Sequence, residues 1–110
     1  MRPIIDIKES TGNVFADLGL PDEAEHLVKA ELTRQIHGLI KRQGLTQAVA
    51  ARRLGLAQPD VSQLMRLRHT GFSTDRLLRL LLMLGRDVDI VLKPAPKRRR
   101  ALGKVRVVAA

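Results

Sequence analysis

The sequence predicts a small, mainly α-helical domain of four to five helices, followed by a short C-terminal β-strand. Three observations carry this prediction. Apolar residues recur at helical spacing from Val28 to Ile40, a glycine at position 55 separates two short helical stretches, and residues 86–93 alternate between apolar and polar. At 110 residues, the chain is long enough for one domain with tails.

The first helix is expected to begin near Pro21 and Asp22 and to be stopped by Gly44. Asp22 and Glu25 have the spacing of a capping box, and Lys41 and Arg42 fall in the last turn, where cations are favoured by the helix dipole. Five apolar residues define the buried face of this helix: Val28, Leu32, Ile36, Leu39 and Ile40. The helix is long, so its N-terminal half is expected to extend beyond the core and to present a partner surface made of Leu27, Val28, Glu31 and their neighbours.

Residues 45–68 predict two short helices joined by a tight turn. Thr46 can cap the first helix, which runs over residues 47–54, and Gly55 supplies the positive φ that the turn needs. Pro59 suits the first turn of the second helix. The apolar residues expected to hold the pair together are Ala50, Leu54, Leu56, Val61 and Leu64. The polar residues left outside, which can contact base edges in a major groove, are Gln58, Asp60, Ser62, Gln63 and Arg66.

This stretch resembles the helix-turn-helix of the Xre/Cro-like regulators, which have a lambda-repressor-like fold. The resemblance rests on the ordered residues Gln47, Ala51, Gly55, Leu56, Gln58, Val61, Ser62 and Leu64. It implies that Gln58, Pro59 and Gln63 face DNA bases, and that Gln47 contacts phosphate and braces Gln58. By position, Ser62 and Arg66 join the base-contacting set. The residues that join the phosphate-binding set are Arg42, Arg68 and His69.

Two positions depart from the usual pattern of such regulators. Ala57 stands where a serine or threonine cap is common, which weakens the start of the second helix by about 1 kcal/mol. Asp60 places a carboxylate where it would repel phosphate unless it accepts a hydrogen bond from a cytosine amine or pairs with an arginine. A plain helical hairpin without a DNA-binding role is the alternative for the whole stretch.

Ser73 is expected to cap a further helix that runs to Leu84 and ends at Gly85. This helix is apolar nearly all round, through Leu77, Leu78, Leu80, Leu81, Leu82 and Leu84. A helix of that kind is buried on more than one side, so we expect part of it to contact a second copy of the chain.

The strand predicted at residues 86–93 needs a hydrogen-bonding partner, either the segment around residues 3–7 or its twin in a second copy. We favour a homodimer formed through Leu81, Leu84, Val88, Ile90 and Leu92. Dimers of this class bind half-sites about 34–36 Å apart. The organisation is then an N-terminal segment (1–20), the helix-turn-helix domain (21–85), the dimerisation strand (86–93) and a basic tail (94–110).

The net charge of +9 is unevenly distributed. Residues 1–31 carry −4, residues 32–92 carry +6, and residues 93–110 carry +7. The positive charge thus lies on the helix-turn-helix and the tail, as a polyanion binder requires. The tail is expected to be solvated in the free protein or to add phosphate contacts, and the resemblance suggests a short strand over residues 104–108.

The string SerThrGlyAsnValPheAlaAspLeuGlyLeuPro at residues 10–21 carries a second resemblance. Followed by a long helix and this helix-turn-helix, it is similar to the HigA-type antitoxins, Xre-like regulators paired with RelE-like toxins. The resemblance implies a type II toxin-antitoxin module in which the chain represses transcription and neutralises a ribonuclease toxin. A stand-alone Xre-family regulator without a toxin, and a basic architectural DNA-binding protein, remain the alternatives.

Several functional classes are disfavoured by composition. The chain has no cysteine, and its histidines lack metal-ligand spacing. Its two phenylalanines are too few for stacking single-stranded nucleic acid. No catalytic or nucleotide-binding motif occurs. We therefore expect no enzyme activity, no metal and no cofactor. The longest apolar run, Leu80 to Leu84, is too short to span a membrane, and no signal peptide is visible, so a cytoplasmic location is expected.

Overall fold

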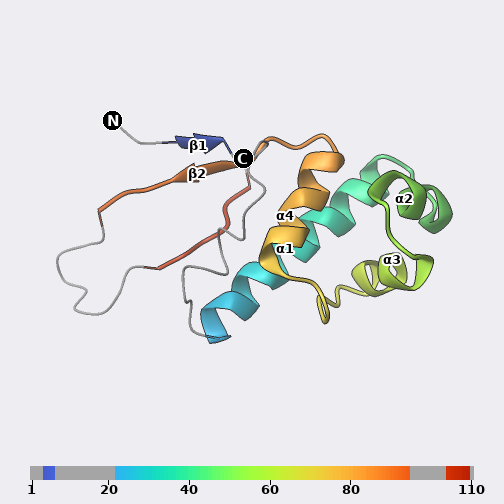
Figure 1. The fold of residues 1–110 in the computed structure, drawn as a ribbon, viewed down its shortest axis with the longest axis horizontal. Coiled ribbons are helices and arrows are strands. Elements are labelled where there is room, and N and C mark those ends of the chain that lie inside the picture. Colours follow the sequence, from blue (N-terminus) through green and yellow to red (C-terminus); the bar gives the residue numbers. More distant parts are fainter. Residues whose placement is uncertain (1–3, 7–21, 95–103, 110) are drawn as a thin grey trace.

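The computed structural model describes residues 4–6, 22–94 and 104–109. Its elements are β1 (Ile4–Asp6), α1 (Asp22–Arg42), α2 (Gln47–Leu54), α3 (Gln58–Met65), α4 (Thr74–Met83) and β2 (Asp89–Val91). The expected mainly helical fold with a short C-terminal strand is confirmed. Figure 1 shows α2 and α3 at one end of the molecule and the two strands at the other. The string at residues 10–21 and the arginine run of the tail lie outside the described residues.

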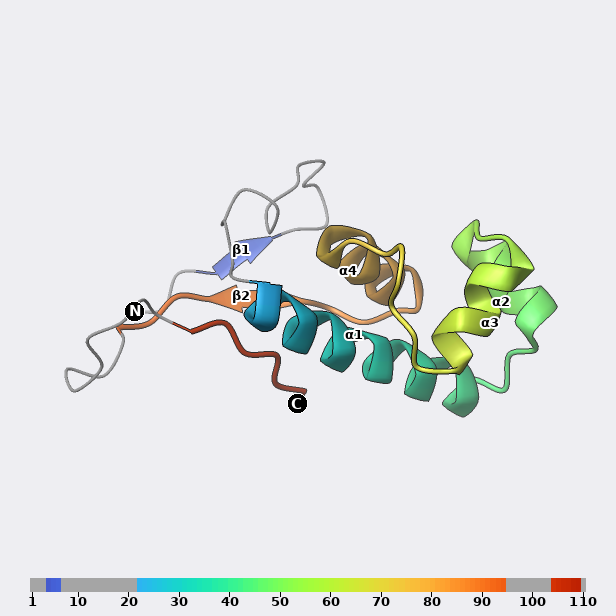
Figure 2. The same cartoon turned by 90° about the horizontal axis from the view of Figure 1, so that it is seen from below.

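The long helix α1 forms the base on which the other helices pack. Figure 2 shows it running beneath α4 towards α2 and α3. All five residues predicted for its buried face lie in the core, together with Thr33, whose Oγ1 donates to the carbonyl of Lys29 at 2.8 Å. This arrangement leaves the C-terminal end of α1 adjacent to the turn that begins the helix-turn-helix.

The turn between α2 and α3 has the predicted construction. Thr46 Oγ1 accepts from the N–H of Val49, and Gly55 adopts the left-handed conformation at φ 65° and ψ 34°. The N–H of Leu56 donates to the carbonyl of Ala51 at 2.9 Å, which closes the end of α2. At the start of α3, Ala57 provides no side-chain cap, as expected from its methyl group. The two helices are therefore locked at a fixed angle by backbone geometry.

Helix α4 does not need a second copy of the chain to cover it, contrary to our expectation. Ser73 caps it as predicted, by accepting from the N–H of Arg76. However, the single chain covers most of its apolar surface, because α4 packs against both α1 and α2. Leu81 and Leu84, which we had assigned to a dimer interface, are only 5% and 4% exposed in the core. The burial of α4 therefore requires no second copy.

The two strands form an antiparallel pair within one chain, with Ile5 opposite Ile90. The N-terminal segment, rather than a twin strand, is thus the partner of β2, which replaces the arrangement we had favoured. A partner in the same chain is always present, whatever the protein concentration. Val88 and Ile90 are half-buried against the core, whereas Leu92, beyond the strand, is 58% exposed.

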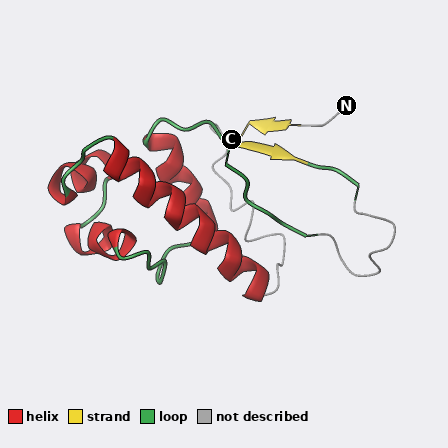
Figure 3. Cartoon of the chain, turned by 180° about the vertical axis from the view of Figure 1, so that it is seen from behind, coloured by secondary structure: helices red, strands yellow, loops and turns green. Residues whose placement is uncertain are grey.

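The C-terminal segment 104–109 does not form the short strand that we had expected. Val105 and Val107 are half-buried against the core, while Lys104 and Arg106 before and between them are exposed. Figure 3 shows this segment on the side of the molecule that carries the strands, away from α2 and α3. This part of the basic tail is therefore not beside the helix-turn-helix. Among the described residues, no helix is long and apolar enough to cross a membrane.

Candidate nucleic-acid interface

Helix α3 presents a polar face to solvent because its other face is anchored in the core. Val61 and Leu64 are completely buried. The residues predicted to contact bases then divide by exposure, with Gln58, Pro59 and Arg66 exposed, and Ser62 and Gln63 half-buried. Helical geometry turns Pro59, Ser62 and Gln63 away from these anchors, whereas Gln58 begins the helix and Arg66 is its C-cap residue. The predicted base-contacting residues thus all lie on α3 or directly after it, and we call α3 the recognition helix after its predicted role.

Gln63 is the less accessible of the two predicted amides. Its Oε1 is buried and has no hydrogen-bond partner among the described residues. A buried acceptor without a partner is unfavourable by about 1–3 kcal/mol, which favours any rearrangement that supplies a donor. The amide is therefore not fully presented in the free protein, unlike that of Gln58.

The phosphate-binding set is only partly gathered around the recognition helix. Gln47 is exposed at the first position of α2, Arg42 is exposed at the last position of α1, and Arg68 is exposed just after α3. The implied brace between Gln47 and Gln58 is not formed in the described part of the chain. Figure 1 shows α2, α3 and the C-terminal end of α1 at the same end of the molecule.

His69 lies elsewhere than we had expected. Its ring contacts that of His26 on α1 at a centroid distance of 4.7 Å, edge to face. The two rings line a shallow cleft with Asp22, Glu25 and Lys29. Burial, together with the nearby charges of His26 and Lys29, lowers the pKa of His69. A half-buried imidazole that packs on α1 and has a lowered pKa is a poor phosphate ligand, so the geometry does not support the role assigned to it.

Asp60 pairs with an arginine, which is one of the two ways in which its carboxylate could be accommodated near DNA phosphate. Its Oδ2 lies 3.9 Å from Nη2 of Arg76, which comes from the first turn of α4. The guanidinium of Arg76 also lies over the ring of Phe72, 4.8 Å from its centroid. The sequence alone did not identify Arg76, because it is separated from Asp60 by a loop of unknown path.

Two further features that hold the recognition helix were missed by the sequence analysis. Leu67, just beyond α3, adopts a positive φ of 59°, and the N–H of Arg68 donates to the carbonyl of Gln63 at 2.9 Å. A left-handed conformation costs leucine about 1–2 kcal/mol, so it is rarely expected at this residue type. Sequence rules that place helix ends at glycines therefore did not identify this helix end. The loop that follows the recognition helix is thereby fixed against its last turn.

Gln43 links three helices. Its Nε2 donates to the carbonyl of Leu84 at the end of α4 at 2.8 Å, and its Oε1 accepts from Nη1 of Arg53 on α2 at 3.2 Å. Because Gln43 directly follows α1, these bonds tie the helix-turn-helix to the core helices. The only sequence feature that could have indicated this role is its position next to the glycine that ends α1.

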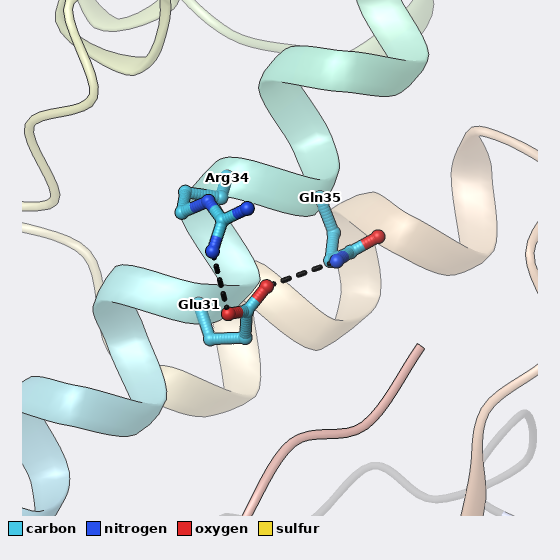
Figure 4. A network of polar contacts seen from close by, with 3 residues as sticks. All are labelled: Glu31, Arg34 and Gln35. Carbon is cyan, nitrogen blue, oxygen red and sulfur yellow. Dashed lines mark hydrogen bonds and ion pairs between the residues drawn. The ribbon is translucent and has the colours of Figure 1, made fainter. Parts of the chain in front are cut away.

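The outer surface of α1 carries a small polar network and one apolar side chain. Figure 4 shows Glu31 accepting from Arg34 Nη1 at 3.1 Å and from Gln35 Nε2 at 2.9 Å. Leu27 is 66% exposed, but Val28 is buried in the core. Of the residues that we had expected to present a partner surface, Leu27 is therefore accessible and Val28 is not. No cluster of three or more potential metal ligands occurs in residues 4–6, 22–94 and 104–109.

Comparisons with known proteins agree with this arrangement. A family model described as a helix-turn-helix domain matches residues 14–93, which include the four helices of the described residues and β2. A solved structure named as a proposed XRE family transcriptional regulator is 43% identical to the chain, with a TM-score of 0.75. That match covers 82% of this chain and 100% of the other. No curated protein matches.

Proposed function

This chain belongs to the Xre-like family of helix-turn-helix, DNA-binding transcriptional regulators, and on that premise we propose that it is an operator-specific repressor acting as a homodimer. The observation that carries the proposal is the polar face of α3, held outward by the buried Val61 and Leu64. A helix presented in this way fits a major groove, where base edges differ between all four base pairs. The action is binding without catalysis.

The roles of the side chains follow from their chemistry. Gln58 can bind adenine through two hydrogen bonds, and Arg66 can do the same with guanine. Gln63 can form the adenine contact once its buried Oε1 turns outward. Gln47, Arg42 and Arg68 supply phosphate contacts, which fix the position of the protein without carrying sequence information. We thus assign discrimination between DNA sequences to α3, and most of the affinity for DNA to the surrounding basic side chains.

A double substitution tests the sequence-specific part of the proposal. A duplex selected from a random pool by the wild-type protein is compared with a scrambled duplex of equal composition. Gln58→Ala with Gln63→Ala should abolish the preference for the selected duplex and leave the salt dependence of binding nearly unchanged. Gln35→Ala, in the polar network on the outer surface of α1, is the matched control and should behave as the wild type.

An equal loss of affinity on both duplexes would instead favour a basic architectural protein. That outcome would contradict the repressor proposal, because an architectural protein binds through phosphates alone.

The proposed dimer is supported by apolar surface near β2. Val91 and Leu92 are 43% and 58% exposed, beside the half-buried Val88 and Ile90. Sedimentation at micromolar concentration should show a dimer for the wild type and a monomer for Leu92→Asp, with Leu67→Asp as the control at another exposed leucine. A monomeric wild type would remove the dimer from the proposal.

A more specific form of this proposal is that the chain is the antitoxin of a type II toxin-antitoxin module. In that role it would bind and neutralise a RelE-like ribonuclease toxin. Its support is the resemblance at residues 10–21 and the exposed Leu27, which follows three acidic residues in the first turn of α1. Copurification with the product of an adjacent ribonuclease gene tests it. Leu27→Glu should reduce recovery of the toxin, whereas Met83→Glu, at an exposed methionine of α4, should not. Without such a neighbouring gene, the stand-alone regulator is the better description.

A further inference from the structure

Asp60 is exceptional in the charge pattern of this chain. Between residues 32 and 74 it is the only acidic residue, in a stretch that contains seven lysines and arginines. It lies in the first turn of α3, on the helix that the proposed function places in the groove. An isolated carboxylate there would be repelled by the DNA phosphates, since like charges at close range oppose association. A positive group of the protein must compensate for this charge if DNA is to bind well.

Asp60 forms an ion pair with Arg76. Its guanidinium lies 3.9 Å from the carboxylate of Asp60 and 4.8 Å from the ring centroid of Phe72, which is buried. The backbone N–H of Arg76 donates to the capping oxygen of Ser73, so the base of the side chain is fixed at the start of α4. Both partners of the ion pair are 43% exposed, so they remain accessible to a bound duplex.

We propose that Arg76 is a positioning residue for DNA recognition, which neutralises Asp60 and holds the first turn of α3 against α4. The aromatic ring of Phe72 supports the guanidinium from below, as expected for a cation over a ring face. This role matters most for α3 because the helix lacks a side-chain cap at Ala57. The inference rests on the proposed DNA binding and adds a residue outside the helix-turn-helix to it.

A double-mutant cycle on Asp60 and Arg76 tests the proposal with the selected and scrambled duplexes. Arg76→Gln should weaken binding about tenfold, because Asp60 is then unopposed near phosphate. Asp60→Asn should bind about as well as the wild type. The double variant should bind like Asp60→Asn, since removing the carboxylate removes the need for its partner. The salt dependence of DNA binding should be the same for Asp60→Asn and for the double variant.

The competing role for Arg76 is a direct phosphate contact. In that case Arg76→Gln would cause the same loss in the wild-type background and in the Asp60→Asn background, with a salt slope reduced by about 1. This result would overturn the proposal. A wild type with no preference for the selected duplex would instead refute operator recognition. The coupling could still be measured on the scrambled duplex, whose phosphates are the same.

Thermal melting of the four proteins distinguishes lost binding from lost folding. If Arg76→Gln melts early, Arg76→Lys provides the test, since it keeps the charge but not the flat contact with Phe72. It should bind within about threefold of the wild type, because a charge near Asp60 remains. A loss as large as that of Arg76→Gln would overturn the proposal.

Discussion

Substituting alanine for glycine at positions 55 and 38 should change the stability of this protein in opposite directions. Gly55 forms the turn of the helix-turn-helix at φ 65°, and Gly38 lies in the interior of α1. The same added methyl group therefore enters two different backbone conformations. Comparing the two variants tests the turn geometry on which the placement of the recognition helix depends.

The magnitudes follow from the surroundings of each glycine. A Cβ at Gly55 would have no heavy atom within 4 Å, so the effect comes from the backbone alone. The left-handed conformation costs an L-residue about 1–2 kcal/mol, and the reduced freedom of the unfolded chain returns about 0.4–1 kcal/mol. Gly55→Ala should thus destabilise by about 1 kcal/mol. At Gly38 a Cβ would meet Nη2 of Arg42 at 3.8 Å, an ordinary contact, so helix propensity should stabilise Gly38→Ala by about 1 kcal/mol.

Thermal and urea unfolding followed by circular dichroism measure both effects. For a domain of this size, 1 kcal/mol corresponds to about 4 °C in melting temperature, so the two variants should differ by about 8 °C. If Gly55→Ala were as stable as the wild type, position 55 would not be left-handed, and α2 and α3 would not meet at this turn. A destabilised Gly38→Ala would refute the helical environment assigned to that position.

Three further changes probe other parts of the structure. Leu64→Ala should destabilise by about 3–5 kcal/mol in denaturant unfolding, because Leu64 is completely buried beneath α3; a loss below about 1 kcal/mol would contradict that anchor. Ala57→Ser should stabilise by about 1 kcal/mol by adding the missing cap to α3, and an unchanged unfolding midpoint would argue against the helix start at residue 58. For the third change, burial and the charges of His26 and Lys29 lower the pKa of His69 from 6.5. The unfolded chain then binds the proton more readily, so stability is complete above about pH 6.5 and falls as the pH drops through the lower, folded value. Melting measured from about pH 7 to 5 should show a shallower fall for His69→Gln, and an unchanged pH profile would refute this linkage.

Local sequence determined the helices of this protein and most of their ends, whereas the end of α3, just before Leu67, was missed. Thr46 and Ser73 cap the helices that follow them, and Gly55 forms the turn, as their chemistry predicts. The periodic apolar residues of α1 were likewise identified correctly as core. These features depend on a residue and its neighbours within one or two turns, so a single sequence contains the information needed to predict them.

Contacts between distant residues were decided only by the tertiary structure. The pairing of β2 with the N-terminal segment, the burial of α4 within one chain and the packing of His69 on α1 all join segments separated by loops. So does the ion pair between Asp60 and Arg76. The physical reason is that charge and hydrophobicity specify that a partner is needed, whereas the path of the chain in space determines which residue supplies it.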